Sequence, residues 1–165
     1  DDLKADADLR GMIAFHFACY GGGTPEMDSF AKQAFKNPQP IADRPFVAAL
    51  PQKMLGHSRG ALAVICHIER AWGYSFLGSK NQPQIAVFAS TLRRLLNGGR
   101  VGAAVEFFND KYSELATELS DLIEESEDKD TKLDPNKLAN LWTSQNDARG
   151  YAIMGDPAVF LPTIS

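Results

Sequence analysis

The sequence predicts a layered α/β fold, in which short buried strands alternate with helices around one core. Two short runs, at residues 12–19 and 61–68, are almost wholly apolar, which is typical of strands buried on both faces of a sheet. Longer segments repeat apolar residues at helical spacing. The 165 residues suit one domain with a sizeable core, and no internal repeat or clear boundary divides them. We therefore expect a single domain over residues 1–165.

The first half of the chain predicts one strand and two helices. The strand ends at Cys19 and is followed by a glycine-rich loop. A short helix is expected over residues 28–35. A second helix is expected to begin near Pro45, which suits a first turn, and to stop at Gly56. Pro51 is awkward inside this helix and is expected to split it.

The second half predicts a strand, an aromatic loop and two amphipathic helices. The strand at 61–68 leads into the aromatic loop at 69–76. A helix at 84–96 is expected to stop at the Asn-Gly-Gly of residues 97–99, and a longer helix follows over 101–125. The remaining expected elements are an exposed acidic loop at 124–134, a short helix at 135–142 and a strand at 150–157.

Composition and charge exclude several classes of function. Hydrophobic residues make up 44% of the chain and charged residues 23%, an ordinary balance for a globular protein. The formal net charge is -4 and the basic residues are scattered, which argues against nucleic acid as a main partner. No apolar run approaches the roughly 20 residues that span a bilayer, so no membrane partner is expected.

The two cysteines, Cys19 and Cys66, both lie in apolar runs. Two are too few for a disulfide scaffold and nothing resembles a signal peptide, so a reducing cytoplasm is the expected location. The sequence starts at Asp1 without an initiator Met. We take it as a cut domain or a processed subunit, so that a catalytic partner is expected upstream.

Cys19 is the leading candidate for a catalytic residue. It ends a predicted strand, and ligands in α/β sheets bind beyond the carboxyl ends of the strands. Gly21, Gly22 and Gly23 follow it, and such glycines let the backbone approach a substrate and direct N–H groups at a developing oxyanion. A thiolate also needs a nearby base. The alternative is a buried core cysteine.

Ser58 is a second candidate nucleophile, since Gly-His-Ser-Arg-Gly at residues 56–60 matches the Gly-x-Ser-x-Gly elbow of α/β-hydrolases. That elbow needs a strand before it and a later acid and His. The preceding segment is predicted helical, and the only later His is His67, inside the next strand. We interpret the motif as a turn between a helix and a strand.

The histidines and cysteines do not predict a metal site. His16, His57 and His67 show no zinc-binding spacing with each other or with the two cysteines, and two of them lie in apolar runs. The three glycines at 21–23 lack the Lys of a phosphate-binding loop and the spacing of a dinucleotide fingerprint. No cofactor is expected.

Trp72, Tyr74 and Phe76 form the aromatic loop after the second strand. If the two strands are parallel, this loop leaves the sheet at the same edge as the Cys19 loop. It is then a candidate wall of a substrate pocket. The alternative is a hydrophobic cover over the sheet edge.

Three stretches carry a family resemblance: Phe-His-Phe-Ala-Cys-Tyr-Gly-Gly-Gly-Thr-Pro at residues 15–25, Gly-Ala-Leu-Ala-Val-Ile-Cys-His-Ile-Glu-Arg-Ala-Trp at 60–72, and Gly-Asp-Pro-Ala-Val at 155–159. Together they resemble the C-terminal part of bacterial caspase-like proteins, the CHAT and gingipain-like group. The resemblance implies a caspase-like three-layer α/β/α sandwich, here a partial domain. It also implies a thiol protease acting on proteins or peptides without a cofactor, with Cys19 as the nucleophile.

The sequence departs from that family at the catalytic base. The family's base is a His, usually followed by Gly, at the end of the preceding strand, and residues 1–18 contain no His-Gly. His16 precedes Cys19 by three residues, a separation that places the two on opposite faces of a strand. The resemblance therefore implies either a His on an upstream segment or subunit, or a catalytically silent module for protein interaction.

Overall fold

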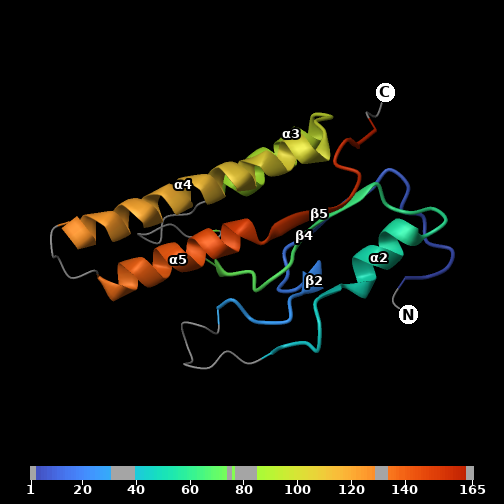
Figure 1. Ribbon diagram of the computed structural model, residues 1–165. Helices are drawn as coiled ribbons and strands as arrows, with labels where there is room; N and C mark the ends of the chain where they lie inside the picture. Colours follow the sequence, from blue (N-terminus) through green and yellow to red (C-terminus); the bar gives the residue numbers. More distant parts are fainter. Residues whose placement is uncertain (1–2, 31–39, 74–75, 77–84, 129–133, 163–165) are drawn as a thin grey trace.

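The computed structural model describes residues 3–30, 40–73, 76, 85–128 and 134–162. Their helices and strands form a mixed α/β domain with a three-stranded sheet and a separate two-stranded sheet (Figure 1). The elements in chain order are β1 (Ile13–His16), β2 (Gly23–Thr24), β3 (Phe46–Val47), α2 (Ala49–Gly56), β4 (Ala63–His67), α3 (Ala86–Leu96), α4 (Val101–Asp128), α5 (Pro135–Arg149) and β5 (Tyr151–Gly155). The predicted α/β class is confirmed at this level.

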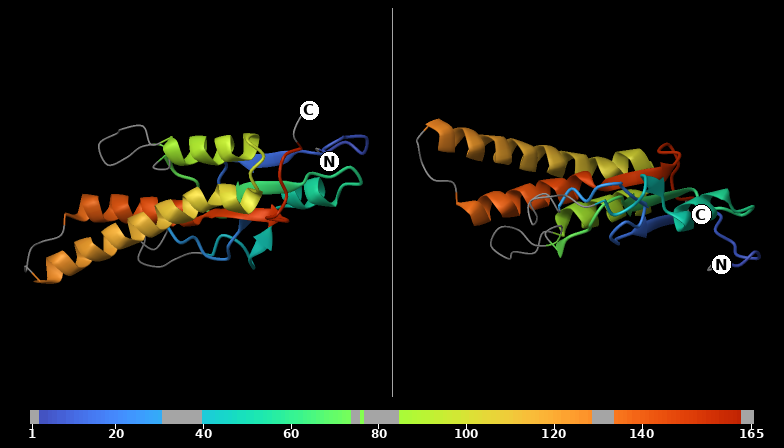
Figure 2. Two further views of the ribbon diagram at one scale, coloured as in Figure 1. Left: turned by 90° about the horizontal axis from the view of Figure 1, so that it is seen from above. Right: turned by 60° about the horizontal axis from the view of Figure 1, so that its bottom comes forward.

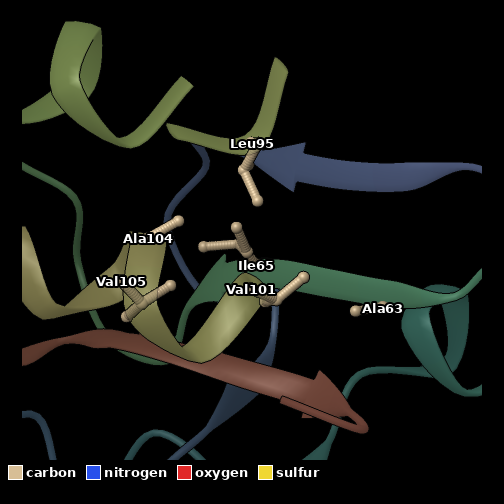
Figure 3. Packing of buried hydrophobic residues seen from close by; sticks show 6 residues of the cluster. All are labelled: Ala63, Ile65, Leu95, Val101, Ala104 and Val105. Carbon is tan, nitrogen blue, oxygen red and sulfur yellow. The ribbon is translucent and has the colours of Figure 1, made fainter. Parts of the chain in front are cut away.

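The main sheet has the order β1-β4-β5, with β4 at its centre. β1 pairs with β4 in parallel and β5 pairs with β4 antiparallel, as Figure 3 shows with β1 outermost. All five residues of β4 are buried, because this strand has a neighbour on each edge and helices over its faces. The predictions of a buried strand here and of a final strand near residues 150–157 are confirmed.

The two faces of the sheet bury alternate side chains of β4, as the two-residue period of a strand requires. On one face Ala63 and Ile65 pack against α3 and α4 (Figure 3). On the other face Val64 and Cys66 pack against Met54 of α2. Helices therefore lie on both faces of the central strand.

The predicted stop at residues 97–99 fixes the turn between α3 and α4. Gly98 has a φ of 76°, and its N–H donates to the Leu95 carbonyl while the Gly99 N–H donates to Arg94. Glycine suits this left-handed position because it has no Cβ to clash. The turn brings α3 against α4, where the Thr91 hydroxyl donates to the Ala104 carbonyl over 3.1 Å.

Helices α4 and α5 run side by side and project away from the sheet (Figures 1 and 2). Their apolar seam includes Leu115 of α4 with Leu141 and Ala148 of α5. Asp134 caps α5 by accepting the Asn136 N–H, with proline in the first turn. Both helices are longer than predicted: α4 continues through the acidic stretch to Asp128, so the expected exposed loop at 124–134 is wrong for those residues.

Two other predicted boundaries are wrong. The first strand covers only Ile13–His16 and is half-buried rather than buried on both faces, because it lies at the edge of the sheet. The helix expected from Pro45 begins at Ala49, so that Pro51 falls in its first turn, where a missing N–H breaks no helical hydrogen bond. The helix expected at 28–35 lies mostly outside the described residues.

No helix in the described part of the chain combines the length and apolar character needed to cross a bilayer.

Candidate active site

The loops that follow β1 and β4 leave the sheet at one edge, because the two strands are parallel. Main-chain hydrogen bonds join the two loops. The Tyr20 N–H donates to the Glu69 carbonyl over 2.7 Å, and the Gly22 N–H donates to the His67 carbonyl over 2.9 Å. The segment around Cys19 is therefore held against the end of the central strand.

Cys19 lies in this loop with an exposed thiol. Its Sγ donates to the Ala71 carbonyl over 3.5 Å, so it faces the loop after β4. The sequence placed Cys19 at the end of a strand, whereas β1 ends three residues earlier, at His16. The alternative of a buried core cysteine is wrong for Cys19, and it describes Cys66 instead.

The three glycines after Cys19 pack closely against the protein itself. A Cβ on Gly22 would lie 2.4 Å from the Cys66 Sγ, and one on Gly23 would lie 2.6 Å from the Phe46 carbonyl oxygen. The N–H groups of Gly21 and Gly22 already donate to Ala18 and His67. A substrate oxyanion would have to compete for these two amides, so the arrangement gives their predicted oxyanion role no support.

The aromatic residues after β4 separate into two groups. Trp72 lies 5.3 Å from Phe30 between ring centroids, and Phe30 lies 5.5 Å from Trp142 of α5. Phe76 packs instead on Phe17 and Phe88, with centroids 4.5 and 4.4 Å away. Trp72 and Phe76 therefore contact different neighbours and do not share one cluster. Tyr74, the third predicted pocket residue, lies outside the described residues.

His67 ends β4 and is fully buried. Its Nε2 donates to the Asp147 main-chain carbonyl over 2.9 Å and lies 3.6 Å from the carboxylate of the same residue. Its Nδ1 faces the main chain of Glu69, 3.0 Å from the carbonyl oxygen and 3.2 Å from the N–H. Both ring nitrogens are engaged, so His67 cannot serve as the base for Cys19 in this conformation.

The other two histidines also make no hydrogen bond to Cys19 in the part of the chain that the structure describes. The Nε2 of His57 lies 3.2 Å from the Ala5 carbonyl. His16 is the last residue of β1. The prediction that His16 and Cys19 lie on opposite faces of one strand does not hold, because Cys19 lies beyond the end of that strand. The thiol's hydrogen-bond partner is the Ala71 carbonyl.

Ser58 lies in the turn between α2 and β4, as the sequence predicted. It is exposed, and it precedes β4 whereas His67 ends that strand. The chain runs from helix to strand through this motif, which is the reverse of a nucleophile elbow. Ser58 and His67 therefore lie toward opposite ends of β4.

A polar network beside Cys19 was not predicted from the sequence. Arg70 donates to the Tyr20 hydroxyl over 3.3 Å and pairs with the buried carboxylate of Asp28. The Ser29 hydroxyl donates to Glu69 over 2.9 Å. The sequence signal for this network is the charged pair Glu69-Arg70, which directly follows the predicted strand at residues 61–68. The network ties residues 28–30 to the loop after β4, on which the Cys19 thiol rests.

Among the described residues, no group of three or more His, Cys, Asp or Glu side chains is placed to hold a metal ion.

Comparisons with known proteins found no relative for this chain. No protein-family model matches it, and neither the curated proteins nor the solved structures contain a match.

Proposed function

We propose that this chain is part of a cysteine peptidase of the caspase-like group, with Cys19 as the nucleophile. The observation that carries the proposal is the exposed Cys19 thiol, in the loop that follows β1 and is hydrogen-bonded to the loop after the parallel strand β4. This edge of an α/β sheet is where such folds bind ligands. The helices on both faces of β4 agree with a three-layer α/β/α sandwich.

The reaction would be hydrolysis of a peptide bond in a protein or peptide substrate. The Cys19 thiolate attacks the scissile carbonyl carbon, and a C–S bond forms. An imidazolium donates its proton to the leaving amine as the C–N bond breaks. Water then hydrolyses the thioester, which releases the acid and restores the thiol. This chemistry uses no metal or organic cofactor.

Among the described residues no histidine bonds to the Cys19 thiol. His67 has both nitrogens engaged in the core, His57 is bonded to Ala5, and His16 makes no hydrogen bond to Cys19. Without a base only a few per cent of an ordinary thiol is ionised at neutral pH. General acid–base help is worth roughly a hundred- to ten-thousand-fold in rate. We therefore assign the base to a His on another segment or subunit, and we expect the chain alone to be inactive.

A second candidate is a catalytically silent caspase-like module that acts by protein interaction. The engaged amides of Gly21 and Gly22 favour it, because a working oxyanion site needs donors free to face the substrate. The thiol would then be a remnant of the active form.

The test compares cleavage of an internally quenched peptide library by the full gene product, its Cys19→Ala variant and its Ser58→Ala variant. We expect Cys19→Ala to lower cleavage by at least about a thousandfold, and Ser58→Ala to leave it within about twofold. Loss of activity only in Ser58→Ala would establish a serine hydrolase. No cleavage, together with no labelling of Cys19 by a peptidyl acyloxymethyl ketone, would establish the silent module.

A further inference from the structure

The loop after β4 holds Cys19 and Tyr20 through three consecutive residues. The Cys19 Sγ donates to the Ala71 carbonyl over 3.5 Å, and the Tyr20 N–H donates to the Glu69 carbonyl over 2.7 Å. Arg70, between these two carbonyls in the chain, donates to the Tyr20 hydroxyl over 3.3 Å. The direction of the Cys19 thiol therefore depends on where this part of the loop lies.

The backbone of Tyr20 shows that contacts impose this arrangement. Its φ is 56°, in the left-handed region, and no other non-glycine residue in the described part of the chain has a positive φ. That region is unfavourable for a tyrosine, because its Cβ lies too close to the following carbonyl oxygen. Such a conformation persists where surrounding contacts hold it, so the bonds to Glu69 and Arg70 outweigh the local preference of the chain.

Arg70 is in turn held by a buried carboxylate. Its guanidinium pairs with Asp28, whose side chain is 2% exposed, whereas the Arg70 side chain is 45% exposed. The other carboxylate oxygen of Asp28 accepts the Phe30 N–H over 3.0 Å, which fixes the carboxylate in place. Because a buried charge that loses its partner is costly, this pair is held more firmly than an exposed one.

Two further contacts fix the same loop. The Ser29 hydroxyl donates to the Glu69 carboxylate over 2.9 Å, and the Trp72 N–H donates to the carboxylate of Asp147, a buried residue of α5, over 2.7 Å. Arg70 differs from these anchors, because its side chain joins a buried carboxylate to the loop that carries the thiol. A change in the ion pair of Arg70 therefore acts directly on that loop.

The bond between Cys19 and Ala71 is made by the thiol and not by the thiolate. A thiolate has no proton to donate, and the partial negative charge of a carbonyl oxygen repels it. The thiolate is nevertheless the form that acts as a nucleophile. Cys19 therefore lies in a resting position, and its sulfur has to leave the Ala71 carbonyl before it reacts.

We propose that Arg70 is a positioning residue: held by Asp28, it keeps the Cys19 thiol on the Ala71 carbonyl, in an unreactive position. Breaking the pair between Arg70 and Asp28 releases this part of the loop and frees the thiol. The consequence for catalysis rests on the proposed function, since this release then has to precede attack on the scissile carbonyl.

The test follows alkylation of Cys19 by iodoacetamide in the folded protein, mapped by mass spectrometry, with Cys66 as an internal reference for unfolding. Asp28→Asn and Arg70→Gln remove opposite charges but break the same pair. A positioning role predicts that both speed Cys19 alkylation at least about threefold, since each frees a weak S–H···O bond, while the Cys66 rate stays unchanged. A purely electrostatic role predicts opposite changes, because a nearby cation favours the thiolate and a carboxylate opposes it.

Asp8→Asn and Arg10→Gln are the matched controls, because they break an ion pair of the same residue types at another place. Asp8 and Arg10 form an exposed pair before the start of β1, whereas Cys19 follows the end of that strand. Neither control should change the Cys19 rate by more than about 1.5-fold, since exposed ion pairs contribute little to stability.

Tyr20→Phe tests the same contact without changing a charge. It removes the hydroxyl that Arg70 binds, and we expect Cys19 to react about twofold faster. This variant decides the outcome if either charge-removing variant also speeds Cys66 labelling, which would show a loss of the fold. Opposite rate changes in the two charge-removing variants, or a wild-type Cys19 rate in Tyr20→Phe, overturn the proposal. A faster Cys19 in variants of a gene product that cleaves no peptide would sustain this inference while the proposed function fails.

Discussion

The two parallel strands β1 and β4 each end in a histidine and each have a cysteine nearby, yet their surroundings differ. β4 is central, and both Cys66 and His67 have no exposed surface. β1 is at the edge and half-buried, and Cys19 in the loop beyond it is exposed. The comparison shows that Cys66, inside the central strand, is enclosed on all sides, whereas Cys19, in a loop beyond an edge strand, is exposed.

The buried end of β4 depends on glycines for its packing. A Cβ on Gly150 would lie 2.2 Å from the Cε1 and Nε2 atoms of His67, and one on Gly22 would lie 2.4 Å from the Cys66 Sγ. The φ of Gly150 is −72°, which any residue can adopt, so it is the close approach of the His67 ring that requires glycine here. The end of β4 is therefore crowded, whereas the Cys19 thiol opens to solvent.

The largest expected difference is in thiol reactivity. Iodoacetamide should label Cys19 of the folded chain at least about a thousandfold faster than Cys66, because burial blocks access to Cys66 and raises the pKa of its thiol to about 11. Peptide mass spectrometry after timed quenching measures both rates. In denaturant the two cysteines should label at similar rates. Equal labelling in the folded chain would contradict the contrast between the two strands.

The next effect is on stability. Gly150→Ala should lower the free energy of unfolding by about 3 kcal/mol, because the new methyl group displaces the His67 ring or the chain around it. Urea unfolding followed by circular dichroism measures the change. Gly56→Ala is the matched control: no atom lies within 4 Å of its added Cβ, so we expect a change within about 1 kcal/mol. Similar effects of the two substitutions would mean that His67 is not crowded.

The smallest expected effect is the pH dependence from Cys66. Its pKa is raised to about 11 in the folded state by burial, so the unfolded chain loses the thiol proton first as pH rises. The contribution is fully present below about pH 9, the ordinary pKa of the thiol, and is lost toward pH 11 at about 1.4 kcal/mol for each pH unit. Tyrosine and lysine residues titrate in the same range, so the measurement is the difference between wild type and Cys66→Ala. If the free energy of unfolding of the two proteins changes with pH in parallel, folding does not raise the pKa of Cys66.

Helix formation was predictable where the signal was local. The apolar repeats predicted α3 and most of α4, and the Asn-Gly-Gly at residues 97–99 predicted where α3 stops. The acidic stretch after residue 124 gave a wrong prediction of a loop, because charge indicates solvent exposure and an exposed helix meets that condition as well as a loop does. Pro45 gave a wrong helix start because proline suits both a first helical turn and an extended segment before a strand.

The surroundings of Cys19 were predictable only in part. The glycine run and the apolar segment before it placed Cys19 in a loop after a strand. The exposure of Cys19 was not predictable, because the local residue pattern does not say which other segments pack over a loop. The engaged amides of Gly21 and Gly22 were likewise hidden, since one acceptor, the His67 carbonyl, lies on another strand.

By itself the sequence determined the kinds and order of most elements, the burial of β4 and the position of Cys19 after a strand, because these follow from residue periodicity and turn chemistry along the chain. Tertiary structure decided which strand lies at the edge and which partners each polar group meets. His67 bonds to Asp147, eighty residues further on, and Trp72 and Phe76 join different aromatic groups. Such partners depend on strand order and helix docking, which bring distant residues together and leave no repeating pattern in the sequence.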